Sequence, residues 1–276
     1  MTNHQPAKKK FGQHFLYDQR VIRRIISIAD LRENERVLEI GPGRGHLTRS
    51  LSESGAIVTA IEIDDKLISG ALLELGGKIN VKIIHGDALN LPDSKMFDTE
   101  GSYKLVANLP YNVGSRILRN IVCGSNPPDV SVVMLQREVS RNLTSSDGKM
   151  GILGAVIGAF ATITQIFLVK PSSFRPPPKV MSSVIKLEAI RPSKVPVSRF
   201  PLYFDFVVKG FSSPRKQIHN SLSGGLVASS DRVKGTLLKC DIDPERRPQT
   251  LSVNEWVDLF DTACAEGYIE ELPSDK

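Results

Sequence analysis

Residues 36–45 (RVLEIGPGRG) decide the fold of this chain. Residues 36–40 read as a short buried strand, and Gly41, Gly43 and Gly45 follow it at every second position. Glycine adopts positive φ values without strain and lets the backbone approach a ligand closely. A helical pattern begins directly after the last glycine. Residues 36–45 therefore predict a strand, a cofactor-binding turn and a helix in succession.

The spacing of the glycines separates two classes of cofactor. A dinucleotide-binding turn requires GxGxxG, and the sixth position of that pattern is His46 here, so the match fails. The observed GxGxG, preceded by Glu39, resembles the S-adenosylmethionine loop of class I methyltransferases. A dinucleotide pyrophosphate is anionic and favours a helix N-terminus. The sulfonium of S-adenosylmethionine is cationic and tolerates nearby carboxylates.

Strand and helix patterns alternate through the first two thirds of the chain. Apolar, β-branched segments predict strands at residues 36–40, 57–63, 81–85, 103–107, 130–135, 162–169 and 182–187. Most of these segments are separated by stretches with helical periodicity. This alternation predicts an α/β fold, a Rossmann-like domain with a mainly parallel seven-stranded sheet.

A proline-rich segment, residues 191–201, marks the expected domain boundary. Helical patterns dominate beyond it, at residues 203–211, 231–238 and 253–265. The sequence therefore predicts a catalytic domain at residues 1–190 that binds S-adenosylmethionine. A small C-terminal α-helical domain, residues 191–276, is expected to position RNA.

Composition favours a nucleic-acid partner and argues against several other classes. The chain of 276 residues has 36 Lys and Arg against 30 Asp and Glu, a net charge of +6. Basic residues gather at Lys8–Lys10 and in a later set that includes Arg215, Lys216, Arg246 and Arg247. The three cysteines are far apart and show no metal-ligand spacing, so we expect no metal site and a reducing, cytoplasmic compartment. No run of eighteen apolar residues occurs, so no membrane partner is expected.

Acidic residues follow the second and third predicted strands. Glu62 lies 62 − 41 = 21 residues after Gly41, and its carboxylate can accept hydrogen bonds from both ribose hydroxyls. Asp87 lies in HGDA, residues 85–88, where it can accept from an adenine amine. Either residue alone could equally be a helix cap. Ligands bind at the carboxyl ends of parallel strands, so the combination favours one cofactor site.

A short motif, Asn108-Leu109-Pro110-Tyr111, follows the fourth predicted strand. In isolation, N-x-P is a common turn signal. In this position, the Asn108 side-chain oxygen and a carbonyl of Leu109 or Pro110 can accept both hydrogens of an adenine N6 amine. The nitrogen lone pair is then free to attack. Tyr111 offers a stacking face, worth about 1–3 kcal/mol per base.

These and further motifs together resemble one family, the ribosomal RNA adenine N6,N6-dimethyltransferases of the small-subunit type. The segments that carry the resemblance occur in order: FGQHFL (11–16), EIGPGRG (39–45), IEID (61–64), GDAL (86–89), NLPY (108–111), LQREV (135–139), SSFRPPPKV (172–180), FSSPRKQIHNSL (211–222) and RRPQTLS (246–252). Two positions depart from it: Met181 stands where relatives often carry Asp, and GKMG (148–151) replaces an aromatic-glycine pairing.

The resemblance implies roles for further residues. His14, the Leu16 backbone, Ala88 and Asn108 would join the glycine loop, Glu62 and Asp87 around S-adenosylmethionine. Phe174 would sandwich the flipped adenine against Tyr111. A lone histidine is otherwise a packed or solvent residue, and an isolated phenylalanine is usually a core residue.

The family implies a reaction and a partner. We expect dimethylation of two adjacent adenosines in a loop near the 3′ end of small-subunit rRNA, on an immature small ribosomal subunit and by a monomer. One alternative is a resistance-type enzyme that methylates one adenine of large-subunit rRNA. FRPPPKV (174–180) and PRKQIHNSL (214–222) favour the small-subunit type over it. A second alternative is a ribosome-assembly factor that mainly binds RNA, but its cofactor and NLPY motifs would be lost, and both are intact here.

Overall fold

The computed structural model describes residues 13–75, 77–90, 101–145 and 149–269, and these form two compact units. The first unit takes the described residues up to 122 together with 126–140 and 163–189. The second unit holds residues 123–125, 141–162 and those from 190 onward. The second unit thus begins near the expected boundary and also includes two earlier segments. Its role in positioning RNA stays a prediction.

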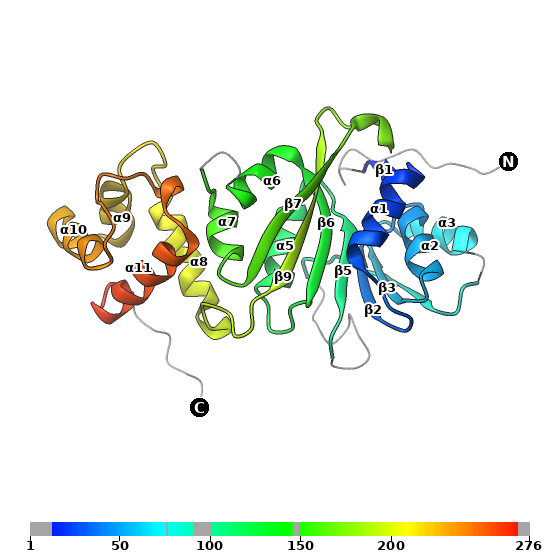
Figure 1. Ribbon diagram of the computed structural model, residues 1–276, viewed down its shortest axis with the longest axis horizontal. Helices are drawn as coiled ribbons and strands as arrows, with labels where there is room; N and C mark the ends of the chain where they lie inside the picture. The colour runs from blue at the N-terminus through cyan, green and yellow to red at the C-terminus, as the bar shows by residue number, and fades with distance from the viewer. Residues whose placement is uncertain (1–12, 76, 91–100, 146–148, 270–276) are drawn as a thin grey trace. The chain divides into compact units, whose positions relative to one another are not determined.

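A seven-stranded sheet of order β4-β3-β2-β5-β6-β9-β7 forms the first unit (Figure 1). Its strands are β2 (Arg36–Ile40), β3 (Ile57–Glu62), β4 (Val81–His85), β5 (Lys104–Asn108), β6 (Val130–Gln136), β7 (Ala161–Val169) and β9 (Ser182–Ala189). The pairs β2·β3, β3·β4, β2·β5 and β5·β6 are parallel, and β9 runs antiparallel to β6. The predicted mainly parallel seven-stranded sheet is confirmed.

The order of the strands reverses next to β2. From this strand the chain first moves outward through β3 and β4, then returns to the other side of β2 and continues through β5 and β6. Ligands of open α/β sheets bind where the order reverses, outside the carboxyl ends of the strands. The glycine loop leaves β2 at this point and the NLPY loop leaves the adjacent β5.

Helices α1 (Gln19–Ala29) and α2 (His46–Glu53) pack on one face of the sheet. The apolar side chains that meet there are at most 5% exposed: Ile22, Ile25, Leu47, Leu51, Val37, Val58, Val106 and Val132. Helices α3 (Asp65–Leu75), α5 (Gly114–Val122) and α6 (Arg137–Thr144) also begin in the described part of this unit. Burial of the apolar side chains between α1, α2 and the sheet stabilises the sheet, and the sheet in turn positions the loops at its edge.

Two very short strands, which the sequence patterns did not predict, form a separate antiparallel pair. In it, β1 (Phe15–Leu16) lies beside β8 (Phe174–Arg175), with Leu16 opposite Phe174. Further bonds reinforce the pairing, since the Tyr17 hydroxyl donates to the Ser172 carbonyl at 2.9 Å and the Ser173 hydroxyl donates to Asp18 at 3.1 Å. Asp18 also caps α1 by accepting from the Arg20 N–H at 3.0 Å.

The second unit is helical. It contains α7 (Ile152–Ile157), α8 (Phe200–Gly210), α9 (Ile218–Leu226), α10 (Ser230–Lys239) and α11 (Val253–Ala265). Its core is aromatic: the rings of Tyr203 and Phe260 lie 5.2 Å apart, and those of Phe206 and Trp256 lie 6.2 Å apart. All four side chains are at most 1% exposed. Aromatic burial of this extent can support a small domain core.

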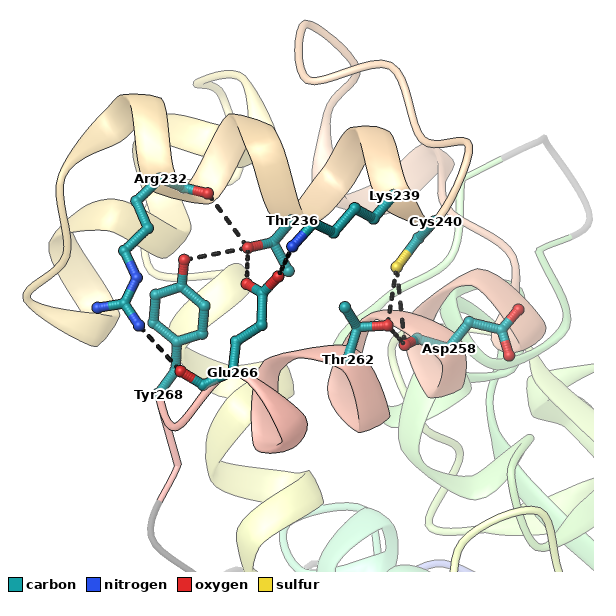
Figure 2. A network of polar contacts seen from close by, with 8 residues as sticks. All are labelled: Arg232, Thr236, Lys239, Cys240, Asp258, Thr262, Glu266 and Tyr268. Carbon is teal, nitrogen blue, oxygen red and sulfur yellow. Dashed lines mark hydrogen bonds and ion pairs between the residues drawn. The ribbon is translucent and has the colours of Figure 1, made fainter.

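A polar network ties α10 to the segment that follows α11 (Figure 2). The Glu266 carboxylate accepts from Thr236 Oγ1 at 2.6 Å and pairs with Lys239 Nζ at 2.5 Å. The Arg232 guanidinium lies 4.3 Å from the centre of the Tyr268 ring and donates to the Glu266 carbonyl at 2.9 Å. Arg232 and Lys239 are thus engaged with partners inside this unit.

Candidate active site

A pocket opens at the carboxyl edge of the parallel strands, where the strand order reverses. Four loops line it, namely residues 39–44 after β2, 61–63 after β3, 86–89 after β4 and 108–113 after β5. Residues 13–16, held by β8, complete the wall. The pocket therefore gathers the glycine loop, the NLPY loop and the strand ends that carry Glu62 and Asp87.

Most residues predicted for the site line this pocket. They are His14, Leu16, Gly41, Gly43, Glu62, Asp87, Ala88, Asn108, Leu109, Pro110 and Tyr111. Gly45 and Phe174 do not line it. The pocket also contains residues that the sequence patterns did not assign, among them Phe15, Glu39 and Arg44. The Arg44 guanidinium lies 4.7 Å from the centre of the Phe15 ring.

The glycine loop needs all three of its glycines for its backbone path. Gly41, Gly43 and Gly45 have φ values of +70°, +57° and +79°, in the left-handed region that side chains disfavour. A Cβ on Gly43 would lie 2.8 Å from Cδ1 of Phe15. Gly45 does not line the pocket, and its backbone conformation serves to begin α2, of which it is the N-cap.

The Glu62 carboxylate is fixed by the backbone around it. Its Oε2 accepts from the Gly43 N–H at 3.1 Å, and its Oε1 accepts from the Asp64 N–H at 2.9 Å. The side chain is 4% exposed, and burial raises its pKa with a further contribution from the charge of Asp64. Each carboxylate oxygen accepts more than one hydrogen bond, so the side chain retains acceptor capacity toward the pocket.

Asp87 serves partly as a turn residue. Its Oδ1 accepts from the Leu89 N–H at 2.9 Å, and its Oδ2 accepts from Asn90 Nδ2 at 3.0 Å. These local bonds orient the carboxylate at the pocket wall after β4. In the structure Asp87 thus both stabilises a local turn and lines the pocket.

Glu39 is a buried carboxyl of the pocket to which the sequence motifs gave no role of its own. It is 1% exposed, and its Oε2 has no hydrogen-bond partner. Burial, reinforced by the nearby charge of Glu62, raises its pKa to about 8. The signal that identifies it in the sequence is an acidic residue two positions before the first glycine of the GxGxG pattern.

The Asn108 side chain presents an unused acceptor. Its Nδ2 donates to the His14 carbonyl at 3.0 Å, which orients the amide. Its Oδ1 is buried and has no protein partner. An unpaired buried acceptor costs roughly 1–3 kcal/mol, so this arrangement fits a ligand that brings an N–H group. The side chain lines the pocket at the end of β5.

The structure also discriminates between the two candidate carbonyls of the NLPY loop. The Pro110 carbonyl already accepts from the Gly114 N–H at 2.7 Å and from the Val113 N–H at 3.3 Å. It therefore belongs to the start of α5. Of the two carbonyls that the sequence left open, the one of Leu109 therefore stays the candidate second acceptor for an amine.

Tyr111 and His14 form the aromatic side of the pocket. Their ring centres lie 5.1 Å apart with planes inclined by 35°. The Tyr111 hydroxyl shares a hydrogen bond with Ser182 Oγ. His14 Nδ1 lies 2.8 Å from the Pro176 carbonyl and donates to it. Burial raises the pKa of Tyr111 although the bond to Ser182 opposes that shift, so its hydroxyl is neutral and its ring is an uncharged stacking surface.

Phe174 lies outside the lining of the pocket. Its side chain is 1% exposed and belongs to the core beneath α1. A role for its ring as a wall for the flipped adenine stays a prediction. Pairing of β8 with β1 sets Phe174 opposite Leu16, which is also in that core. In this structure Phe174 packs as a core residue.

The sequence profile of the family described as Ribosomal RNA adenine dimethylase matches residues 4–264. The chain belongs to this family. The expectation of an S-adenosylmethionine-dependent rRNA adenine dimethyltransferase is confirmed, and S-adenosylmethionine is the methyl donor.

Individual relatives agree with the family. Proteins named ribosomal RNA small subunit methyltransferase A are 36% identical in Dehalococcoides mccartyi strain CBDB1, covering 92% of this chain and 87% of the relative, and 36% identical in Geobacter metallireducens, covering 95% and 97%. A dimethyladenosine transferase structure from Plasmodium falciparum superposes with a TM-score of 0.78 at 25% identity, covering 93% and 99%. The class I methyltransferase fold is confirmed.

The pocket residues fit S-adenosylmethionine. Two buried carboxyls, Glu39 and Glu62, face a cavity whose ligand is cationic at sulfur. The glycine loop leaves room for close backbone approach, and the buried oxygens of Glu39 and Asn108 lack protein partners. No cluster of three or more His, Cys, Asp or Glu side chains in the described residues could hold a metal ion. Among the same residues, no helix has the length and apolar character needed to cross a bilayer.

At both departures from the family pattern, the described residues make backbone hydrogen bonds. Met181 contributes its backbone carbonyl, which accepts from the Arg137 N–H at 3.0 Å. Any residue can make that hydrogen bond, so a change of side chain is tolerated there. In the second departure, Gly148 lies outside the described residues. The N-terminal residues Lys8–Lys10 and Phe11 of the sequence motifs also lie outside them. Gly151 donates its N–H to the Asn142 carbonyl at 2.8 Å, again a backbone hydrogen bond.

Proposed function

We propose that this protein dimethylates N6 of two adjacent adenosines in a loop near the 3′ end of small-subunit rRNA. Its substrate would be an immature small ribosomal subunit in the cytoplasm, and it would act as a monomer. The observation that carries the proposal is the unpaired, buried Asn108 Oδ1 beside Tyr111, at the edge of the cofactor pocket. The small-subunit relatives support the choice of rRNA.

The cofactor pocket would hold S-adenosylmethionine through the chain's own polar groups. Glu62 would accept from the ribose hydroxyls, and Asp87 with the Ala88 backbone would contact the adenine. The Glu62 carboxylate would favour the positive charge of the cofactor. Bound S-adenosylmethionine supplies an electrophilic methyl group. The Phe15 ring lies so close to Gly43 that a side chain at position 43 would collide with it.

The NLPY loop would prepare the amine for attack. The adenine N6 lone pair is normally conjugated with the ring, which makes the amine a weak nucleophile. Asn108 Oδ1 and the Leu109 carbonyl accept its two hydrogens and favour a pyramidal nitrogen, while the Tyr111 ring supports the flipped base. The methylated nitrogen is strongly acidic and releases a proton to water, so no strong protein base is required.

The test is methyl transfer to ribosomal subunits of each kind. Purified protein is incubated with labelled S-adenosylmethionine and with separately purified, unmethylated small or large subunits, and the modified nucleosides are mapped. We expect dimethyladenosine at two adjacent positions of the small-subunit rRNA. Label in one large-subunit adenine instead would support the resistance-type alternative. Tight RNA binding without label in either subunit would support an assembly factor.

The assignment of Glu62 gives a prediction for cofactor affinity. Glu62→Ala is expected to weaken S-adenosylmethionine binding by roughly ten- to a hundredfold, because a hydrogen bond to a charged group is worth about 1.5–3 kcal/mol. Calorimetric titration of the folded variant measures this. Glu53→Ala, which removes an exposed carboxylate at the end of α2, is the matched control. Equal affinities for the two variants would remove Glu62 from the ribose site.

The basic residues expected to bind RNA differ in whether they form ion pairs within the protein. Arg246 pairs with Glu255 at 2.5 Å and also donates to the Thr250 carbonyl. Glu255 completes the capping box of α11 with Ser252. Arg246 is therefore a structural residue, whereas Arg215, Lys216 and Arg247 are exposed and make no ion pair within the described residues.

This division predicts different salt dependences. Replacing Arg215, Lys216 and Arg247 together with Ala is expected to weaken rRNA binding and to lower the slope of log affinity against log salt by about 0.7–0.9 for each phosphate that is no longer neutralised. S-adenosylmethionine affinity is expected to stay unchanged. Filter binding at several salt concentrations measures the slope, with Lys209→Ala, which removes an ion pair to Asp205, as control. An unchanged slope in the triple variant would shift the RNA footprint toward Lys8–Lys10 and α1.

A further inference from the structure

Ser182 lies behind the Tyr111 ring although the two residues are 71 positions apart in the chain. It is the first residue of β9 and is completely buried. Its hydroxyl shares a hydrogen bond with the Tyr111 hydroxyl. The Tyr111 ring itself approaches His14, whose own ring is held by the Pro176 carbonyl. Tyr111 is thus restrained at its hydroxyl and beside its ring.

The antiparallel direction of β9 is what brings Ser182 to this place. In register with β6, Ser182 lies opposite Gln136, the last residue of that strand, while β6 runs parallel to β5. The first residue of β9 therefore lies at the carboxyl edge of the sheet, where the NLPY loop leaves β5. A parallel strand would have placed its first residue at the opposite edge.

The adjacent serine is engaged elsewhere. Ser183 is equally buried, but successive strand residues point to opposite faces. Its hydroxyl accepts from Ser140 Oγ at 3.0 Å. Neither serine lines the pocket itself. The chain thus supplies two neighbouring buried hydroxyls of the same size, of which only Ser182 contacts Tyr111.

We propose that Ser182 is a positioning residue for methyl transfer, which fixes the plane of the Tyr111 ring for stacking against the flipped adenine. The inference rests on the proposed function, since it concerns the base that Tyr111 supports. Ser182 contacts neither cofactor nor reacting atoms and acts through the Tyr111 hydroxyl. A prealigned ring spares the substrate complex the entropy of ordering that side chain.

The kinetic test is a double-mutant cycle between Ser182→Ala and Tyr111→Phe. Each variant is expected to lower the single-turnover methylation rate about three- to tenfold, as for removal of one neutral hydrogen bond. The double variant is expected to be no slower than either single variant. Ser183→Ala is expected to keep the normal rate, and S-adenosylmethionine affinity is expected to be equal in all four. Independent, multiplying decreases, or a normal rate for Ser182→Ala, would overturn the proposal.

A second measurement needs no RNA substrate. The chain has five tyrosines, so the ring-¹³C tyrosine spectrum is simple, and Tyr111→Phe identifies the Tyr111 signal. Ser182→Ala is expected to shift and broaden that signal, whereas Ser183→Ala leaves it in place. An unchanged Tyr111 signal in folded Ser182→Ala protein would refute the positioning role. Failure of the wild type to methylate small subunits would instead refute the proposed function and leave this spectral comparison intact.

Discussion

Asn108→Ala is expected to lower single-turnover methylation by a factor of about 10² to 10³, the decrease seen when one group that acts in the transition state is removed. The physical reason is that Asn108 Oδ1, buried and without a protein partner, accepts from N6 as its lone pair leaves ring conjugation. The rate is measured with saturating S-adenosylmethionine and rRNA. Affinity for rRNA is expected to be nearly unchanged, because phosphate contacts dominate it.

Two comparisons test whether the decrease in rate comes from the amine-acceptor role of Asn108. Asn112→Ala changes a neighbouring amide of the same pocket, and we expect a much smaller decrease in rate. Tyr111→Ala is expected to impair placement of the base more than Tyr111→Phe, which keeps the stacking surface. Near-normal turnover of Asn108→Ala would show that Asn108 only stabilises the turn before Pro110, and the amine-acceptor mechanism would be rejected.

Glu39→Gln is expected to flatten the dependence of protein stability on pH. The pKa of Glu39 is about 8 in the folded chain against an ordinary value of 4.5. Between these values the folded protein holds a proton that the unfolded chain releases, so the contribution of Glu39 to stability is greatest below pH 4.5 and falls as pH rises toward 8. The decrease in stability between pH 5 and pH 8 is on the order of 3 kcal/mol.

Urea unfolding at several pH values measures this effect. Gln stays neutral throughout, so the variant is expected to gain stability relative to wild type as pH rises. Glu53→Gln, at an exposed position, should give a curve parallel to that of wild type. Parallel curves for Glu39→Gln and wild type would show that Glu39 is ionised in the folded protein at neutral pH.

The local patterns were sufficient for the sheet and for the loops of the site. Strands β2, β3, β5 and β6 were predictable because a parallel sheet buried on both faces needs continuous apolar runs. The positions of the glycine loop, Glu62, Asp87 and the NLPY loop followed from the strand ends, since parallel strands bring their carboxyl ends to one edge. Helix α9 escaped prediction because its sequence, IHNSLSGGL, contains two adjacent glycines, and burial of Ile218 and Leu222 stabilises it instead.

The sequence by itself determined which chemistry this protein performs, through short motifs whose function depends on neighbours in the chain. Only the tertiary structure decided how those motifs are supported. It placed Phe174 in the core, engaged Arg246 with α11, left Asn108 Oδ1 unpaired and set Ser182 behind Tyr111. Each of these outcomes depends on burial and on partners far away in the chain, which the topology of β8 and β9 brings together and which no local periodicity encodes.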